Sequence, residues 1–165
     1  DATNTSAIQK INNLKKRNSP LSVMIDDIKS IKKYANLDSN TFNNINKILP
    51  GPFTILLKAK KNNLSYLVQN ESDKIGIRIP NTMFCLNLLK KYKKPIITTS
   101  VNIHDKEPLN NIDEIERNFP DINIYKNGIN KSSKGSTIID FTFDKPKVIR
   151  QGDGEYILWT FLEES

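Results

Sequence analysis

The chain has 165 residues, with 25 Lys and Arg against 18 Asp and Glu and a net charge of +7. An apolar share of 37% and a charged share of 26% exclude a disordered chain, and the length predicts one globular domain with its own core. No run of about 18 apolar residues is present, so we expect no membrane partner. The positive charge favours phosphate-bearing partners. Much of the excess, however, is expected on helix faces and ends, as at Lys32, Lys33, Lys90 and Lys91, where a solvated surface is the favoured interpretation of any single lysine.

The histidine and cysteine counts exclude several familiar site chemistries. One His and one Cys cannot form a zinc site by themselves, and neither a Walker loop nor a Gly-x-Gly-x-x-Gly fingerprint is present. Cys85 has no partner for an intramolecular disulfide, which fits a reducing, cytoplasmic location, and its apolar neighbours predict a buried helical position. His104 lies in a polar loop and is expected at the surface.

The first predicted element is a helix over residues 5–16, because apolar residues recur at helical spacing on one face: Ala7, Ile8, Ile11 and Leu14. It ends in the cations Lys15, Lys16 and Arg17. Cations at this end of a helix either offset the helix dipole or form a phosphate clamp. Because the first residues lead directly into this helix, we expect a further amino-terminal segment to precede Asp1.

Residues 21–25 form the first predicted strand of this chain, and Asp26 is expected to cap a helix that follows it. A second helix, from about residue 41, is expected to stop at the Pro-Gly-Pro of residues 50–52, because prolines cannot continue it. Residues 53–58 then resume as a strand.

The next strand, residues 74–80, alternates isoleucines with Gly76 and Arg78, so Arg78 points away from the core. An arginine in the middle of a strand is unfavourable to bury without a partner. The anionic partner is either an internal Asp or Glu or a ligand carboxylate held by the guanidinium group.

A helix over residues 82–92 leads into residues 95–102, which we predict to contain the central strand of the sheet. Its carboxyl end presents Thr98, Thr99, Ser100 and Asn102. In open α/β sheets ligands bind at such ends, where loop amides and polar side chains converge. We therefore predict a small-molecule site at Ser100.

The remaining chain predicts a helix at residues 112–119, a short strand at 123–125, a loop near the site at 126–135 and strands at 136–141 and 147–150. The apolar tail, residues 156–162, is a candidate edge strand. Cations and hydroxyls at element ends suit an anionic, phosphate-rich substrate and poorly suit hydrolysis by paired carboxylates.

Six motifs, in this order, resemble those of the YrdC family: Lys-Lys-Arg at 15–17 followed by Pro-Leu at 20–21, and residues 50–54, 77–80, 99–102, 136–140 and 149–152. Together they span almost the whole chain. The resemblance implies an α/β fold, a YrdC-like twisted, mixed, open sheet with flanking helices and a basic central cavity. It also implies that residues 1–165 are a single domain that lacks its first strand or strands, which would precede Asp1.

The resemblance also implies an enzyme, a nucleotidyltransferase that acts as a threonylcarbamoyl-AMP synthase. Such enzymes combine L-threonine, bicarbonate and ATP, with magnesium, into threonylcarbamoyl-AMP and pyrophosphate. The product supplies the tRNA threonylcarbamoyltransferase complex downstream. Carried over by position, the ATP side comprises Lys15, Arg17, Ser100, Asn102 and Arg150, and the L-threonine side comprises Arg78, Thr98 and Ser136. No metal ligand and no acid or base is identified.

Two rival functions stay open. A non-catalytic YrdC-like protein would use the same basic concavity to bind double-stranded RNA or tRNA. A carbamoyl-transfer module, as in hydrogenase-maturation proteins, would need partner domains that these residues do not contain. Val101 and His104 depart from the usual family pattern, which leaves room for a paralogue with a different substrate.

Overall fold

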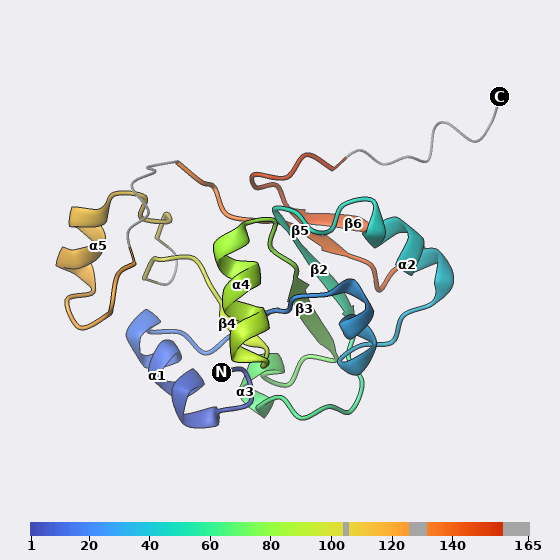
Figure 1. The fold of residues 1–165 in the computed structure, drawn as a ribbon, viewed down its shortest axis with the longest axis horizontal. Helices are drawn as coiled ribbons and strands as arrows, with labels where there is room; N and C mark the ends of the chain where they lie inside the picture. Colours follow the sequence, from blue (N-terminus) through green and yellow to red (C-terminus); the bar gives the residue numbers. More distant parts are fainter. Residues whose placement is uncertain (104–105, 126–131, 157–165) are drawn as a thin grey trace.

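The structure is a computed structural model, and it describes residues 1–103, 106–125 and 132–156. Within these ranges the chain forms one mixed sheet of six strands in the order β4-β1-β3-β2-β5-β6 (Figure 1). β1 pairs with β3 and β2 with β5 in parallel, and the other neighbours are antiparallel. The bounds are β1 Ser22–Met24, β2 Phe53–Lys58, β3 Lys74–Arg78, β4 Ile96–Thr98, β5 Thr137–Asp140 and β6 Lys147–Arg150.

Short helices surround the sheet: α1 Thr5–Lys15, the 3₁₀ helix η1 Ile28–Lys33, α2 Ser39–Asn46, α3 Tyr66–Gln69, α4 Met83–Tyr92 and α5 Ile112–Asn118. Side-chain caps fix several starts, because Asn4 accepts from the backbone N–H of Ala7 and Asp38 accepts from that of Thr41. In Figure 1, α4 lies across one face of the sheet, α1 and α3 lie next to each other, and α5 stands on an arm to one side.

The core is built on a row of apolar residues that crosses four strands. Val23 pairs with Ile77, Ile77 with Ile55, and Ile55 with Ile139, and each of the four is 0% exposed. Because side chains alternate along a strand, Arg78 lies on the opposite face of β3 from Ile77. The alternation predicted for residues 74–80 is therefore confirmed.

Most predicted elements are present. The strands predicted at 53–58 and 147–150 coincide with β2 and β6, and the helices predicted at 5–16, 82–92 and 112–119 differ from α1, α4 and α5 by one residue at most at each end. The α/β class with a mixed open sheet and flanking helices is confirmed. His104, most of the loop at 126–135 and the tail beyond Tyr156 lie outside the described residues.

Two predictions about strands are wrong. Residues 96–98 form β4 at an edge of the sheet, and not its central strand, which agrees with the only partial burial of Ile96 and Thr98. Residues 123–125 form no strand, because they follow α5 on the arm and Tyr125 is 81% exposed there. Neither error moves the hydroxyl-bearing tip of β4 away from the site.

Three predictions about helices also need correction. The element after β1 is a 3₁₀ helix capped by Asp27, whose carboxylate accepts from the N–H of Lys29, whereas Asp26 lies one residue too early. Cys85 is half-buried instead of buried. The buried face of α1 carries Ile8, Asn12 and Lys15, while Leu14 is 42% exposed, so a lysine takes the place predicted for an apolar residue.

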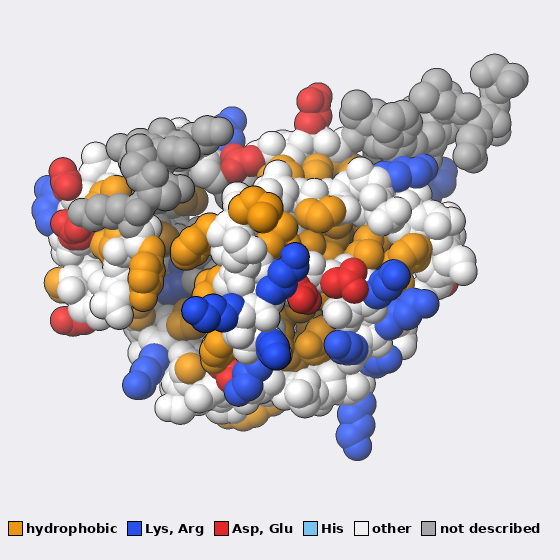
Figure 2. Space-filling model, in the orientation of Figure 1, with side chains coloured by type: hydrophobic (Ala, Val, Ile, Leu, Met, Phe, Trp, Pro, Cys, Tyr) orange, Lys and Arg blue, Asp and Glu red, His pale blue; other side chains and the backbone are white. Residues whose placement is uncertain are grey.

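Among the described residues, no helix combines the length and the apolar character needed to cross a lipid bilayer. The lysines predicted on helix faces and ends are exposed, including Lys32, Lys33, Lys90 and Lys91. Figure 2 shows such cationic side chains spread over the face that α4 crosses.

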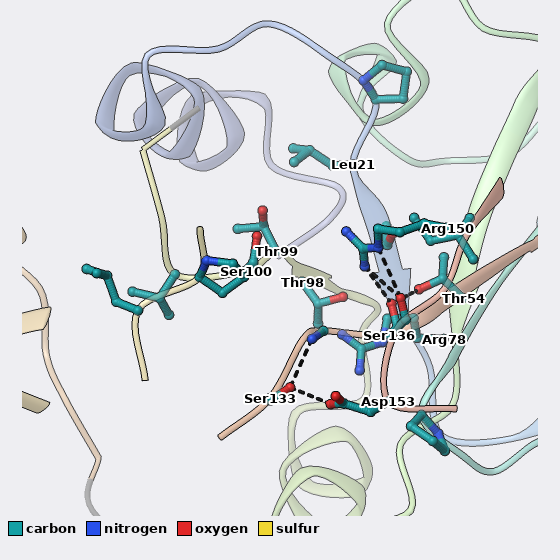
Figure 3. A pocket seen from close by; sticks show the side chains of 18 of the residues that line it. Leu21, Thr54, Arg78, Thr98, Thr99, Ser100, Ser133, Ser136, Arg150 and Asp153 are labelled. Atoms are coloured by element: carbon teal, nitrogen blue, oxygen red, sulfur yellow. Dashed lines mark hydrogen bonds between the residues drawn. The ribbon is translucent and has the colours of Figure 1, made fainter. Parts of the chain in front are cut away.

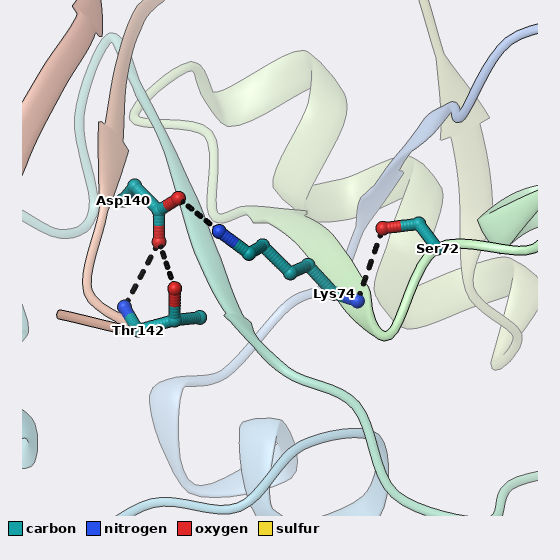
Figure 4. A network of polar contacts seen from close by, with 4 residues as sticks. All are labelled: Ser72, Lys74, Asp140 and Thr142. Carbon is teal, nitrogen blue, oxygen red and sulfur yellow. Dashed lines mark hydrogen bonds and ion pairs between the residues drawn. The ribbon is translucent and has the colours of Figure 1, made fainter.

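An ion pair ties β3 to β5 on the arginine-bearing face, at the end of β3 away from Arg78. Lys74 Nζ lies 2.6 Å from Asp140 Oδ2, and Thr142 donates to Oδ1 of Asp140 from its N–H (2.9 Å) and its hydroxyl (2.6 Å) (Figure 4). Asp140 is 2% exposed. Burial alone raises the pKa of Asp140, but the hydrogen bonds from Lys74 and Thr142 outweigh burial and hold this pKa below 3.8.

Asp140→Asn is expected to lower the free energy of unfolding by about 1–3 kcal/mol at pH 7, because it leaves the Lys74 ammonium without its anion. The folded-state pKa of Asp140 is depressed, so the ionised carboxylate stabilises the folded chain above pH 3.8. This stabilisation is lost as the pH falls through the folded-state pKa. Urea unfolding of both proteins measures it. Lys94→Gln, which breaks the exposed Lys94–Asp1 pair, should change stability by only about 0.5 kcal/mol, and equal losses in both variants would contradict this assignment.

Candidate functional site

A pocket of about 370 Å³ opens beside the tip of β4, where the end of α1, the start of β5 and the end of β6 meet (Figure 3). Six of the eight predicted site residues line it: Arg17, Arg78, Thr98, Ser100, Ser136 and Arg150. The other two, Lys15 and Asn102, do not line it. The sequence therefore identified one pocket from residues that are far apart along the chain.

The register of the sheet explains why Arg78 and Arg150 meet. Ile138 of β5 pairs with Arg150 of β6 on one side and with Thr54 of β2 on the other. Continuing the antiparallel register of Ile55 and Ile77 by one residue places Thr54 opposite Arg78. Residues directly opposite each other share a face, so the two arginines lie in one row on the same face, three strands apart.

Arg78 has the least satisfied environment in the pocket. Among the described residues its side chain forms no ion pair, and its buried Nε has no hydrogen-bond partner. The buried hydroxyl of Thr98, also in the pocket wall, is equally without a partner. Burial is the main influence on Arg78 and lowers its pKa, as does the charge of Arg150, while Cys85 and Asp153 act in the opposite direction. The internal Asp or Glu partner that the sequence left open is therefore not found here.

Arg150 is held in place by the backbone and side chain of Ser136. Its Nη2 donates to the Ser136 carbonyl at 2.7 Å and lies 3.3 Å from the Ser136 hydroxyl, and its Nε donates to the same carbonyl at 3.2 Å. The Ser136 hydroxyl in turn shares a hydrogen bond of 2.7 Å with Thr54. The guanidinium group is thus oriented before any ligand arrives.

Arg17 reaches the pocket from the turn that ends α1. Lys16 adopts the left-handed conformation with φ 52°, and the N–H of Arg17 donates to Asn12. The side chain of Arg17 donates to Ser19 at 2.6 Å and to the carbonyl of Pro20 at 3.3 Å. The phosphate-clamp prediction for this helix end thus remains open for Arg17.

Lys15 and Asn102 lie behind the wall of the pocket instead of in it. Lys15 is 3% exposed, and its Nζ donates to the carbonyls of Ser100 (2.5 Å) and Asn102 (2.9 Å) and to Asn102 Oδ1 (2.5 Å). The Ser100 hydroxyl donates to the same Oδ1 at 2.7 Å. In this arrangement Lys15 and Asn102 fix the segment that carries Ser100 into the pocket.

Sequence reasoning missed several residues of the pocket wall, including Asp153, Ser133, Asn110 and Thr54. Asp153 lies in the turn after β6, between Gly152 and Gly154. An Asp between two glycines indicates a tight turn, and this pattern could have identified the residue from the sequence. Ser133 lies in the loop at 126–135 that was predicted near the site, although not as a site residue, whereas no local pattern indicates Asn110.

The cations of the pocket are all arginines. Three of the four arginines in the chain line it, whereas no lysine among the described residues does, although lysines outnumber arginines more than fivefold. A guanidinium group offers a planar fork that matches carboxylate and phosphate oxygens, which an ammonium group lacks. The pocket therefore suits an anion that is recognised through two oxygens at a time.

Among the described residues, the wall of the pocket contains no His, Cys, Lys or Glu, and its one carboxylate is Asp153. Among the described residues no group of three or more His, Cys, Asp or Glu could hold a metal ion. The arrangement can bind and orient polyanions, and the described residues of its wall include no His, Lys or Glu that could act as a base.

Lys15→Met tests the buried lysine. Burial, together with the charge of Arg17, lowers the pKa of Lys15 from 10.5 to about 8. Between these values the unfolded chain binds a proton that the folded chain lacks, so this group adds stability as the pH rises from 8 to 10.5, by about 3 kcal/mol. Urea unfolding at pH 7, 9 and 10.5 should show this rise in the native chain relative to Lys15→Met, and parallel pH curves would contradict it.

Comparisons with known proteins agree with the geometry. The family model Sua5_yciO_yrdC, described as "Telomere recombination", matches residues 1–152. The Methanocaldococcus jannaschii protein named "Putative threonylcarbamoyl-AMP synthase" is 40% identical over 156 residues, which are 92% of this chain and 72% of that protein. The Escherichia coli "Uncharacterized protein YciO" is 28% identical over 138 residues, which are 81% of this chain and 66% of that protein.

Two solved structures share the fold. The P. abyssi Sua5 structure, complexed with L-threonine, superposes with a TM-score of 0.81 at 22% identity, covering 92% of this chain and 46% of that chain. The E. coli YciO structure gives a TM-score of 0.83 at 24% identity, covering 94% of this chain and 77% of that chain. This chain thus spans about half the length of Sua5. With residues 1–152 inside one family model and the fold in common, the chain belongs to the Sua5/YciO/YrdC family.

Proposed function

We propose that this chain is a threonylcarbamoyl-AMP synthase, a nucleotidyltransferase that uses ATP, L-threonine and bicarbonate. It releases pyrophosphate and passes threonylcarbamoyl-AMP to the complex that makes threonylcarbamoyl-adenosine in tRNA. The observation that carries the proposal is the convergence of three of the four arginines on one pocket. The name of the M. jannaschii relative and the threonine complex of P. abyssi Sua5 support the choice of substrates.

In this proposal the two ends of the pocket bind different reactants. Arg17 and Arg150, with Ser100, bind the phosphates of ATP, and Lys15 and Asn102 contribute by holding Ser100 from behind. Arg78, with Thr98 and Ser136, binds the carboxylate of L-threonine. The unpartnered Nε of Arg78 and hydroxyl of Thr98 supply two donors at the threonine end.

The chemistry follows from this placement. The amine of threonine adds to the carbon of bicarbonate with loss of water, and an oxygen of the resulting carbamate attacks the α-phosphorus while pyrophosphate leaves. Magnesium bound to ATP supplies charge neutralisation at the phosphates. The side chains of the chain hold the reacting groups in line and stabilise the departing charge, so catalysis rests on positioning and electrostatics instead of proton transfer.

Pyrophosphate release tests the proposal directly. The full-length protein that contains this chain should release pyrophosphate from ATP only when threonine and bicarbonate are both present. Release that persists without threonine would contradict the synthase. Salt-sensitive binding of RNA without any ATP-dependent release would instead favour the non-catalytic RNA-binding function.

Two arginine variants test the assignment of the two ends. Arg78→Ala should raise the KM for threonine far more than that for ATP, and Arg150→Ala should do the reverse. A lost charge-assisted hydrogen bond weakens binding by about 2–4 kcal/mol, or about 30- to 1,000-fold.

Arg117→Ala is the matched control, because the fourth arginine lies on α5 outside the pocket and should leave both KM values unchanged. Equal losses for both substrates in the two pocket variants would mean that the ends of the pocket are assigned wrongly.

A further inference from the structure

Among the described residues, Asp153 is the one carboxylate in the wall of a pocket that three arginines make positive. A negative charge at this place opposes the binding of any anion, by Coulomb's law. Among the described residues it forms no ion pair with Arg78 or Arg150, although its charge raises the pKa of Arg78. The charge of Asp153 thus acts on Arg78 without direct contact, and its hydrogen bonds indicate a further role.

The contacts of Asp153 supply that role. Its Oδ2 accepts from the Ser133 hydroxyl at 2.5 Å (Figure 3). Its Oδ1 accepts from the N–H of Lys134 at 2.8 Å. The Ser133 hydroxyl also accepts from the N–H of Gly135 (3.0 Å). The carboxylate thus fixes three consecutive residues that lead directly into Ser136.

Asn110 joins this arrangement from the other rim. Its side chain accepts from the N–H of Ser133 (3.1 Å) and donates to the Ser133 carbonyl (3.3 Å). Both loops line the pocket, so one contact chain, Asn110 to Ser133 to Asp153, connects two rims that belong to different parts of the chain.

The turn that carries Asp153 is itself firmly placed. A Cβ on Gly152 would lie 2.2 Å from the carbonyl oxygen of Gly135, so the two backbones touch. The N–H of Asp153 donates to that same carbonyl (2.8 Å), and the N–H of Gly152 donates to the hydroxyl of Thr137 (2.9 Å). Asp153 is therefore presented from a rigid support and not from a free loop end.

The segment that Asp153 fixes determines the place of Arg150. Ser136 supplies both oxygens that orient Arg150, and a Cβ on Gly135, which has φ +81°, would lie 3.2 Å from Arg150 Nη2. The geometry points to Asp153 as a positioning residue, which holds residues 133–135 so that Ser136 keeps Arg150 oriented toward an incoming phosphate. The inference rests on the proposed function only for the identity of that phosphate.

Hydrogen exchange in the ligand-free protein tests the positioning role by itself. Asp153→Ala removes the acceptors, so the amides of Lys134 and Gly135 should exchange at least about tenfold faster. Asp153→Asn keeps an oxygen for Lys134 and an amide group for Ser133, so it should restore most of the protection. Asp144→Asn is the matched control, because Asp144 is exposed, lies between β5 and β6, and has no contact with the pocket. Unchanged exchange in Asp153→Ala would overturn the inference.

Binding of inorganic pyrophosphate, measured by titration calorimetry, separates positioning from simple charge. Coulomb's law alone predicts that both Asp153 variants bind the anion more tightly than the native chain. Positioning predicts opposite signs: weaker binding for Asp153→Ala, by about tenfold, and restored or tighter binding for Asp153→Asn. Tighter binding by both variants would refute the inference.

A double variant excludes general destabilisation. If Asp153 acts through Ser133, then Ser133→Ala added to Asp153→Ala should weaken pyrophosphate binding no further, whereas independent effects would multiply. Loss of turnover in Asp153→Asn with native exchange and native pyrophosphate affinity would overturn the inference in favour of a catalytic carboxylate. A native chain that binds no pyrophosphate would count against the proposed function, and the exchange result would still decide the role of Asp153.

Discussion

The site depends on one constraint, the strand register that places Arg78 and Arg150 in a single row on one face of the sheet. On β3, β2 and β5 the opposite face is closed by the fully buried Ile77, Ile55 and Ile139, so the register of these strands cannot slip without exposing the core. The residues of β6 are exposed, and Arg150 is placed by its pairing with Ile138 and its hydrogen bonds to Ser136. Strand pairing and the packing of these apolar residues thereby hold both guanidinium groups on one face of the sheet. The two positive charges repel each other, which is unfavourable in the ligand-free fold and is relieved when an anion binds.

The surroundings of the two arginines differ, and this difference gives the pocket two ends. Arg150 is oriented by Ser136 and is backed by the contacts of Asp153, so its direction is set in advance. Arg78 is partly buried with an unpartnered Nε, so it has the larger unmet demand for a charged partner. A ligand with two separate anionic groups, such as a nucleotide and an amino acid bound together, matches both conditions.

The sequence predicted the strands with clear alternation and six of the pocket residues, because motifs at strand ends mark places where the chain must present polar groups. It failed where tertiary contacts override local pattern. Lys15 was expected to face a phosphate, but it is buried behind Ser100 and Asn102, and β4 was expected in the centre of the sheet although it lies at an edge. Asp153 was missed because its role exists only once β5 and β6 bring two loops together.

The central claim is that Arg17, Arg78 and Arg150 serve one pocket for a nucleotide and an amino acid. A crystal structure of the protein with a non-hydrolysable ATP analogue and L-threonine tests it most directly. The account predicts phosphate oxygens within hydrogen-bond distance of Arg17 and Arg150 and the threonine carboxylate on Arg78. A triphosphate bound outside this pocket, or a threonine carboxylate away from Arg78, would contradict it.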